Sequence, residues 1–195
     1  MSAEPEVVSL YTRAVDAFLA AVDQVPDGAW AAPTPCPDWD VRALVNHVVG
    51  EDRWVVPLLE GRTIAEVGDA LDGDLLGAAP PESATTAGKA ASAAFAEPGA
   101  TERTVHLSFG DTPAEEYVRQ LAADHLIHAW DLAVATGADP TMDEAAVRAC
   151  ADWFAGREHL YRQSGAIGPA AEVPPTASEQ DRLLAAFGRN PAWTP

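Results

Sequence analysis

The sequence predicts an all-α protein, and three observations support that class. Apolar residues recur at steps of three and four through about residues 5–25, which places their side chains on one face of a helix. Alanine makes up much of the 48% hydrophobic content, and alanine favours helices. Strand-like alternation is confined to residues 101–109. We therefore expect four main helices with long crossovers, packed as a bundle.

A proline-rich connection separates the first two main helices. Residues 26–28 (Pro-Asp-Gly) end the first helix, and three prolines between 33 and 40 favour an extended segment because they forbid regular helix. Either Asp38 or Asp40 can cap the next helix by accepting a hydrogen bond from a free N–H group. This second helix carries His47 and should end near residues 59–61.

The middle of the chain predicts a long crossover followed by a third main helix. Residues 62–81 are rich in Gly, Asp and Pro, so we expect a connection there with a short helix around 64–70. Residues 83–95 are rich in alanine and should form the third helix. The extended segment 101–109 should turn at residues 110–111 (Gly-Asp).

The fourth main helix has the clearest start signal in the chain. Thr112 can act as its N-cap, Pro113 suits the first helical position, and Glu115 completes a capping box. Gly137 is placed to end it.

Two shorter helices are expected after it. A second capping box, at residues 141–144, opens a helix running to about residue 162. A Gly/Pro-rich stretch at 164–175 then leads to a short helix over 178–187, ended by Gly188. We interpret residues 1–195 as one domain, with about 164–195 as a tail that packs on the bundle.

Composition excludes several classes of partner. The net charge of −18, with 12 Lys and Arg, argues against binding to nucleic acid or to an anionic membrane. No apolar stretch reaches the roughly 18–20 residues that span a bilayer, and the first residues lack the features of a signal peptide. Two cysteines are too few for a disulfide framework. A reduced cytoplasm is therefore the expected location.

A metal site is the main functional hypothesis from the residues themselves. Asp124 and His128 lie four residues apart, so they point the same way from one helix, and a buried carboxylate needs a partner. His47, in an apolar helical run, is the best further donor. Imidazole and carboxylate ligands suit zinc, nickel, iron or manganese, and three protein ligands leave positions open. The alternative is a hydrogen-bonded core aspartate beside two half-buried histidines.

Four further residues are candidates for supporting roles. Glu51 shares the helical face of His47 and is a fourth ligand, a general base or a solvated carboxylate. His125 points roughly 100° away from Asp124 around the helix, which favours a flanking position. Asp131 can accept the free ring N–H of a metal-bound His128. Cys36 lies between two prolines with no evident base nearby, which favours packing over nucleophilic attack.

Three motifs carry a resemblance to a known family. Residues 34–47 (TPCPDWDVRALVNH), 124–133 (DHLIHAWDLA) and 187–193 (FGRNPAW) resemble the mycothiol-dependent maleylpyruvate isomerase-like proteins, which belong to the DinB-like metal-binding superfamily. The resemblance implies a DinB-like four-helix bundle with long crossovers and a short C-terminal helix. It also implies a divalent metal, zinc as the first expectation, on His47, Asp124 and His128. The family has Glu where this chain has Asp124, and the isomerase carries an extended C-terminal domain that we do not expect here.

Three functions remain open at this stage. In the first, a low-molecular-weight thiol such as mycothiol binds the metal, loses its proton and attacks an electrophilic substrate, as a transferase or isomerase requires. In the second, water replaces the thiol, and Glu51 or His125 accepts a proton, which gives a hydrolase. In the third, the chain is a non-catalytic metal-binding module that forms a homodimer through a helical face.

Overall fold

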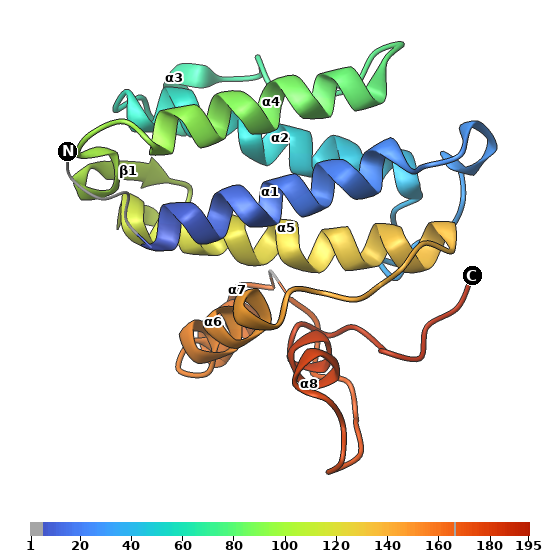
Figure 1. Ribbon diagram of the computed structural model, residues 1–195. Coiled ribbons are helices and arrows are strands. Elements are labelled where there is room, and N and C mark those ends of the chain that lie inside the picture. Colours follow the sequence, from blue (N-terminus) through green and yellow to red (C-terminus); the bar gives the residue numbers. More distant parts are fainter. Residues whose placement is uncertain (1–5, 166) are drawn as a thin grey trace.

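The computed structural model describes residues 6–165 and 167–195, and it is mostly helical with one small sheet, as Figure 1 shows. Its long helices are α1 (Glu6–Asp23), α2 (Val41–Leu59), α4 (Pro80–Phe95) and α5 (Ala114–Thr136). They run side by side, with α1 against α5 and α4, and α2 against α4 and α5. The mostly helical class expected from the sequence is confirmed.

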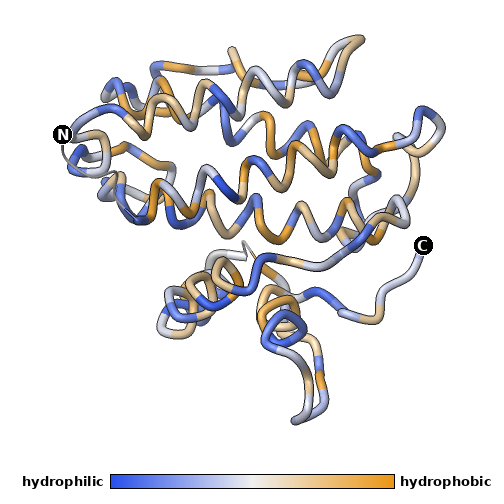
Figure 2. The backbone as a smooth tube through the Cα atoms, viewed as in Figure 1, coloured by the Kyte–Doolittle hydropathy of each residue, from blue (hydrophilic) through white to orange (hydrophobic). Residues whose placement is uncertain are grey.

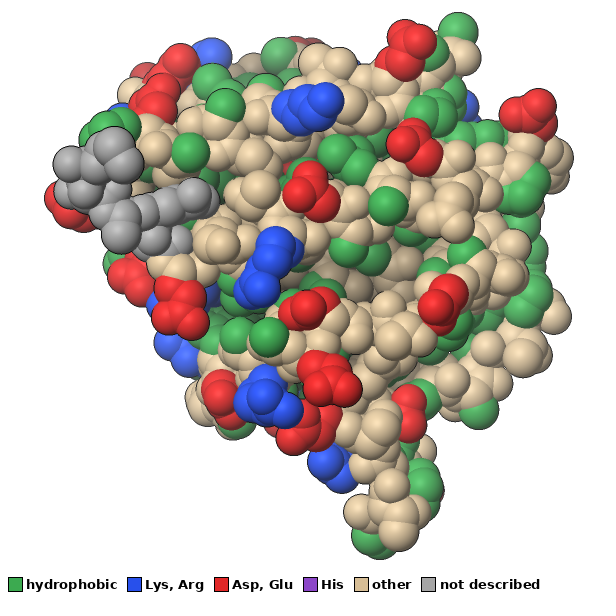
Figure 3. Space-filling view, viewed as in Figure 1, with side chains coloured by type: hydrophobic (Ala, Val, Ile, Leu, Met, Phe, Trp, Pro, Cys, Tyr) green, Lys and Arg blue, Asp and Glu red, His purple; other side chains and the backbone are tan. Residues whose placement is uncertain are grey.

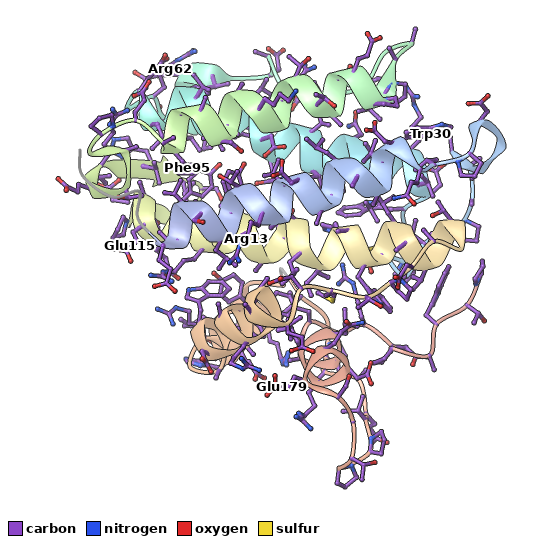
Figure 4. All side chains as sticks on the ribbon, viewed as in Figure 1. Arg13, Trp30, Arg62, Phe95, Glu115 and Glu179 are labelled. Atoms are coloured by element: carbon purple, nitrogen blue, oxygen red, sulfur yellow. The ribbon has the colours of Figure 1, made fainter. Side chains whose placement is uncertain are left out.

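Apolar stripes on these helices meet between them. Figure 2 shows hydrophobic segments along the long helices. The stripe expected on α1 is buried in full: its members are Val7, Leu10, Tyr11, Ala14, Phe18 and Val22. Burying one such aliphatic or Phe side chain contributes roughly 1.5–3 kcal/mol. Phe95, labelled in Figure 4, is 1% exposed at the end of α4, and its ring meets the Tyr11 ring at 5.2 Å.

Asp40 is the N-cap of α2. Its side chain accepts a hydrogen bond from the Ala43 N–H at 2.8 Å, so Asp40 rather than Asp38 is the cap. The preceding segment is closed by a bridge between Pro33 and Asp40, after the short helix η1 (Asp27–Ala29). The expected end of this helix near 59–61 is confirmed, with Gly61 at a φ of 85°.

The crossover after α2 holds one helical turn. Helix α3 (Ile64–Val67) begins with a capping box between Thr63 and Glu66. It is shorter than the expected 64–70 because Gly68 takes a φ of 62° and ends it. Helix α4 starts at Pro80, before the expected residue 83.

The start predicted for the fourth main helix is wrong. After η2 (Ala100–Glu102), the chain forms an antiparallel hairpin of β1 (Thr104–Leu107) and β2 (Gly110–Pro113), turning at residues 108–109 rather than 110–111. Thr112 pairs with Val105 in that ladder, and its hydroxyl donates to the Gly110 carbonyl instead of capping a helix. Helix α5 starts at Ala114 without a side-chain cap. Its expected end at Gly137, which has a φ of 74°, is confirmed.

The second predicted capping box is also wrong. Asp143 caps α6 (Glu144–Phe154) by accepting from the Ala146 N–H, while the Thr141 hydroxyl donates to Asp139. The expected single helix to about 162 is broken into α6 and α7 (Glu158–Ser164). Gly156, a weak helix former, lies in the turn between them.

The C-terminal elements lie along the α5 side of the long helices, as Figure 1 shows. Helix α8 (Glu179–Ala186) begins at the N-cap Ser178 and ends near Gly188, as expected. Acidic side chains are scattered over the face drawn in Figure 3. Across residues 6–165 and 167–195, no helix has the length and apolarity to cross a bilayer.

Candidate metal centre

Helices α2 and α5 bring three donor side chains to one place. His47 lies on α2, and Asp124 and His128 lie one turn apart on α5. One ligand atom from each lies within 4.8 Å of the others. The side chains of His47 and Asp124 are 29% and 28% exposed, and that of His128 is 5% exposed, so the group opens on one side.

The distances in this group suit a cation better than hydrogen bonds. His47 Nε2 lies 3.4 Å from Asp124 Oδ2, and His128 Nε2 lies 3.3 Å from Asp124 Oδ1. A charge-assisted N–H···O bond is about 2.7–2.9 Å long. Ligands about 2.0–2.2 Å from a tetrahedral metal lie roughly 3.3–3.6 Å apart. Asp124 Oδ2 is buried with no hydrogen-bond partner among the described residues, a cost that a bound cation would remove.

Charge within the group is mutually stabilised. Burial raises the pKa of Asp124, but the His128 and His47 imidazoles outweigh burial and hold that pKa well below its usual range. Burial lowers the pKa of His128, but Asp124 and Asp131 outweigh burial and hold it well above its usual range. A cation at this position would compete with protons for the same imidazole nitrogen.

Asp131 fixes the orientation of the His128 ring. Its Oδ2 lies 2.9 Å from His128 Nδ1, so Nδ1 carries the proton and Nε2 is left to face Asp124. Asp131 is fully buried and is balanced by Arg189, whose guanidinium donates to both carboxylate oxygens at 2.9–3.3 Å. Burial raises the pKa of Asp131, but hydrogen bonds from His128 and Arg189 outweigh burial and lower it.

The proline-rich connection supplies a wall beside the donors. The Thr34 hydroxyl donates to the Trp39 carbonyl at 2.8 Å and accepts from the Cys36 N–H at 3.1 Å, which closes a tight turn. This turn lays the Trp39 ring 4.6 Å from the His47 ring. Cys36 Sγ accepts from Arg189 at 3.2 Å and lies 3.5 Å from Asp131.

A second potential ligand group is less suited to a cation. Cys36, His128 and Asp131 also place donor atoms within 4.8 Å of one another. Asp131, however, is already neutralised by Arg189, whereas Asp124 has no arginine or lysine partner among the described ion pairs. The group of His47, Asp124 and His128 is therefore the better candidate for a metal centre.

The donors open into a cavity of about 1010 Å³. Glu51 lines it, one turn after His47, and burial together with the Asp124 charge raises the Glu51 pKa. Tyr117 also lines it, and its buried hydroxyl has no hydrogen-bond partner among the described residues. Burial and the nearby carboxylates, Glu51 first, hold the Tyr117 pKa well above its usual range.

His125 belongs to a separate buried network. Its Nδ1 donates to the Leu121 carbonyl at 2.9 Å, and its Nε2 lies 3.2 Å from the Asp52 carboxylate, which also accepts from the Tyr11 hydroxyl at 2.7 Å. His125 is fully buried and does not line the cavity, so it is not placed to accept a proton from a ligand there.

Sequence reasoning found part of this arrangement and missed the rest. Helical spacing groups Asp124, His128 and Asp131, and His47 is added as the best donor in another apolar helical run. The contact of Arg189 with Asp131 has no local signal, although Arg189 lies in the 187–193 motif, because the ion pair joins residues 58 apart. Sequence reasoning also missed Asp52, whose only signal is a carboxylate on the buried face of α2.

The fold and the donor set define a helical protein with a candidate metal centre, and comparison with known proteins gives its family. Residues 11–133 match the family model described as mycothiol maleylpyruvate isomerase N-terminal domain, and the chain belongs to this DinB-like family.

Relatives cover nearly the whole chain. Two Mycobacterium tuberculosis proteins, from strains CDC 1551 / Oshkosh and ATCC 25618 / H37Rv, are each 33% identical over 191 residues. The matches cover 92% of this chain and 95% of each relative, and both relatives are described as uncharacterized. No solved structure matches the chain.

Proposed function

We propose that the chain is a divalent-metal protein that acts on a low-molecular-weight thiol of the mycothiol type, as a transferase or isomerase. The observation that carries the proposal is the donor group of His47, Asp124 and His128 with its unpartnered Asp124 oxygen, open to a large cavity. Membership of a mycothiol-related family supports the choice of thiol. Imidazole and carboxylate donors favour zinc first, then nickel, iron or manganese.

The protein's own residues prepare the site for this chemistry. A bound divalent cation lowers the pKa of a thiol beside it and so favours the reactive thiolate at neutral pH. Asp131 holds the proton on His128 Nδ1, and Arg189 balances the Asp131 charge. Trp39 covers the His47 ring and limits water on that side.

The architecture is part of the same proposal. We infer that α1, α2, α4 and α5 form a DinB-like four-helix bundle, in which facing helices supply the ligands. Residues 1–195 then make one domain, with the segment from about 164 packing on the bundle and delivering Arg189.

Metal content tests the centre directly. We expect elemental analysis to find about one divalent ion per purified chain, as a single three-ligand site predicts. His47→Ala should lose most of it, because one of three ligands is gone. His159→Ala, an exposed histidine on α7, is the matched control and should keep its metal. Equal metal content in all three proteins would overturn the proposal.

Thiol use needs a second measurement on the same samples. Calorimetry should detect mycothiol binding to the zinc-loaded protein and not to the protein stripped by a chelator. The zinc-loaded protein should also accelerate conjugation of mycothiol to 1-chloro-2,4-dinitrobenzene. If the metal-loaded protein neither binds mycothiol nor accelerates its conjugation, the proposed thiol function is wrong.

Glu51 favours a second candidate, a metal-assisted hydrolase. Its carboxylate lines the cavity one turn from His47, where it could accept a proton from water. Hydrolysis of an ester, amide or phosphoester panel without thiol, lost in Glu51→Gln, would select this alternative. Thiol-dependent turnover with no hydrolysis would exclude it.

A further inference from the structure

The cavity above the candidate metal centre has a lining that bears on what it binds. Aromatic and aliphatic side chains form most of its wall, including Trp54, Leu58, Ile127, Trp153 and Phe187. They come from α2, α5, α6 and the segment after α8, so the surface is built by several elements. At about 1010 Å³, it is at the upper end of the roughly 300–1,000 Å³ typical of small-molecule sites.

Charged groups in the lining oppose an anionic ligand. Asp38, Glu51 and Asp124 contribute carboxylates to it. Within the described part of the chain, Arg189 is the one lysine or arginine in the lining. Its guanidinium already donates to Asp131, to the Phe187 carbonyl and to Cys36 Sγ. Away from the metal ligands, a dicarboxylate would therefore meet the acidic side chains of Asp38 and Glu51 and no lysine or arginine that is free of partners.

One large apolar side chain in the cavity lining is exposed to solvent. Phe109 lies in the hairpin turn, lines the cavity and is 72% exposed. Exposing a phenyl ring costs hydrophobic free energy that contact with an apolar ligand would recover. Leu160 on α7 is also exposed, at 55%, but does not line the cavity, so the two residues form a matched pair.

We propose that this cavity takes an uncharged, ring-bearing small molecule as the partner of the thiol, and that it disfavours dicarboxylates. That the cavity is a substrate site rests on the proposed function. The chemical class of its ligand follows from the apolar lining and the charged side chains. It separates this chain from a maleylpyruvate-type substrate, which carries two carboxylates.

Two ligands that share a benzene ring conjugated to an alkene test the preference. trans-4-Phenyl-3-buten-2-one is uncharged, whereas trans-4-carboxycinnamate keeps the ring and alkene and carries two carboxylates. We expect calorimetry on the zinc-loaded protein to give at least about tenfold tighter binding of the ketone, or about 1.4 kcal/mol. Equal or tighter binding of the dicarboxylate would overturn the proposal.

Single substitutions test which residues cause the preference for an uncharged ligand. Phe109→Ser should weaken ketone binding several-fold, and Leu160→Ser should leave it unchanged. Glu51→Gln should improve dicarboxylate binding, because it removes an anionic group from the wall. If Phe109→Ser and Leu160→Ser bind the ketone equally, or if Glu51→Gln leaves the dicarboxylate unimproved, the assignment is wrong.

Failure of this inference can be told apart from failure of the proposed function. Metal content and mycothiol binding are measured without either ligand. A protein that holds metal and mycothiol but prefers the dicarboxylate contradicts only the ligand class. A protein that holds zinc and prefers the ketone but does not bind mycothiol contradicts only the thiol function.

Discussion

Asp131 connects three side chains that the sequence spreads over the chain. It orients His128, neutralises Arg189 and contacts Cys36, while being fully buried itself. Breaking one partner out of a buried ion pair leaves an uncompensated charge, which costs more than the pair gains. The same carboxylate also fixes which ring nitrogen of His128 faces the cavity, so its loss should affect both stability and metal affinity.

Asp131→Asn should lower the free energy of unfolding by about 3–5 kcal/mol, the usual cost of breaking a buried pair. It should also weaken zinc binding about 10–100-fold, as loss of a ligand-orienting partner does. Urea unfolding and competition with a chromophoric chelator measure the two effects. Asp16→Asn, an exposed position on α1, should change neither. Normal zinc affinity in a folded Asp131→Asn protein would show that Asp131 does not orient a ligand.

At the scale of residues, local spacing groups the candidate donors of α5 but gives neither His47 on α2 nor the Arg189 contact. Asp124, His128 and Asp131 lie within two turns of one helix, so periodicity alone places them together. Arg189 reaches them from beyond α8, and its direction depends on Gly188, which takes a φ of 77° with the Pro169 carbonyl close by. No sequence period encodes such a tertiary contact.

At the scale of elements, side chains from α1 and α2 pack closely against α4 at Gly88. A Cβ built there would lie 2.9 Å from Val15 Cγ1 and 3.4 Å from Asp52 Oδ2. Asp52 is held there by the Tyr11 hydroxyl and by His125, so it has little freedom to retreat. The glycine is therefore a packing requirement inside a helix, where it is otherwise unfavourable.

Gly88→Ala should destabilise the protein by roughly 1–3 kcal/mol, because overpacking outweighs the gain in helix propensity. Gly50→Ala on α2 is the matched control. Its Cβ would meet only the Leu75 side chain at 3.5 Å, an ordinary contact, so propensity should stabilise it by up to about 1 kcal/mol. Denaturant midpoints with unchanged slopes measure both. A stabilised Gly88→Ala protein would show that α1 and α2 move apart from α4 at little cost, which would contradict the packing requirement.

The observed helix ends show which of the predicted helix caps are correct. Cap chemistry predicts Asp40, with Asp38 as the alternative, as the start of its helix and Gly137 as the end of another, and both residues take these places. The Thr112 and Thr141 signals failed because another interaction engages each residue. Thr112 pairs in the hairpin, and Thr141 turns onto Asp139, which leaves Asp143 as the cap. A capping motif competes with tertiary pairing that the local sequence does not contain.

At the scale of the whole molecule, buried ionised groups lie inside a strongly acidic chain. The net charge is −18, and the described arginines pair mainly with surface carboxylates, as the Arg42–Asp74 and Arg119–Glu115 pairs illustrate. Such exposed pairs contribute little, about 0–1 kcal/mol each. The buried histidines should therefore dominate how stability depends on pH above neutrality.

His125 and His128 determine the direction of that dependence. Burial lowers the pKa of each, but Asp52 raises that of His125 and Asp124 raises that of His128, so both end above 6.5. Their stabilising contribution is fully present below 6.5 and is lost as pH rises through the folded-state values. Asp131 has the opposite sign: its contribution is present above 3.8 and is lost as pH falls through its lowered pKa.

The metal-free protein should thus lose stability as the pH rises above about 6.5. Each histidine can contribute a slope of up to about 1.4 kcal/mol per pH unit. Urea unfolding from pH 5.5 to 9 in the presence of a chelator measures the profile. His159→Gln should reproduce it, because that histidine is exposed. Saturating zinc should remove the pH dependence of stability that His128 contributes, since the cation replaces the proton on that ring. A chelated protein whose stability stays level or rises between pH 6.5 and 8.5 would contradict the charged state assigned to both rings.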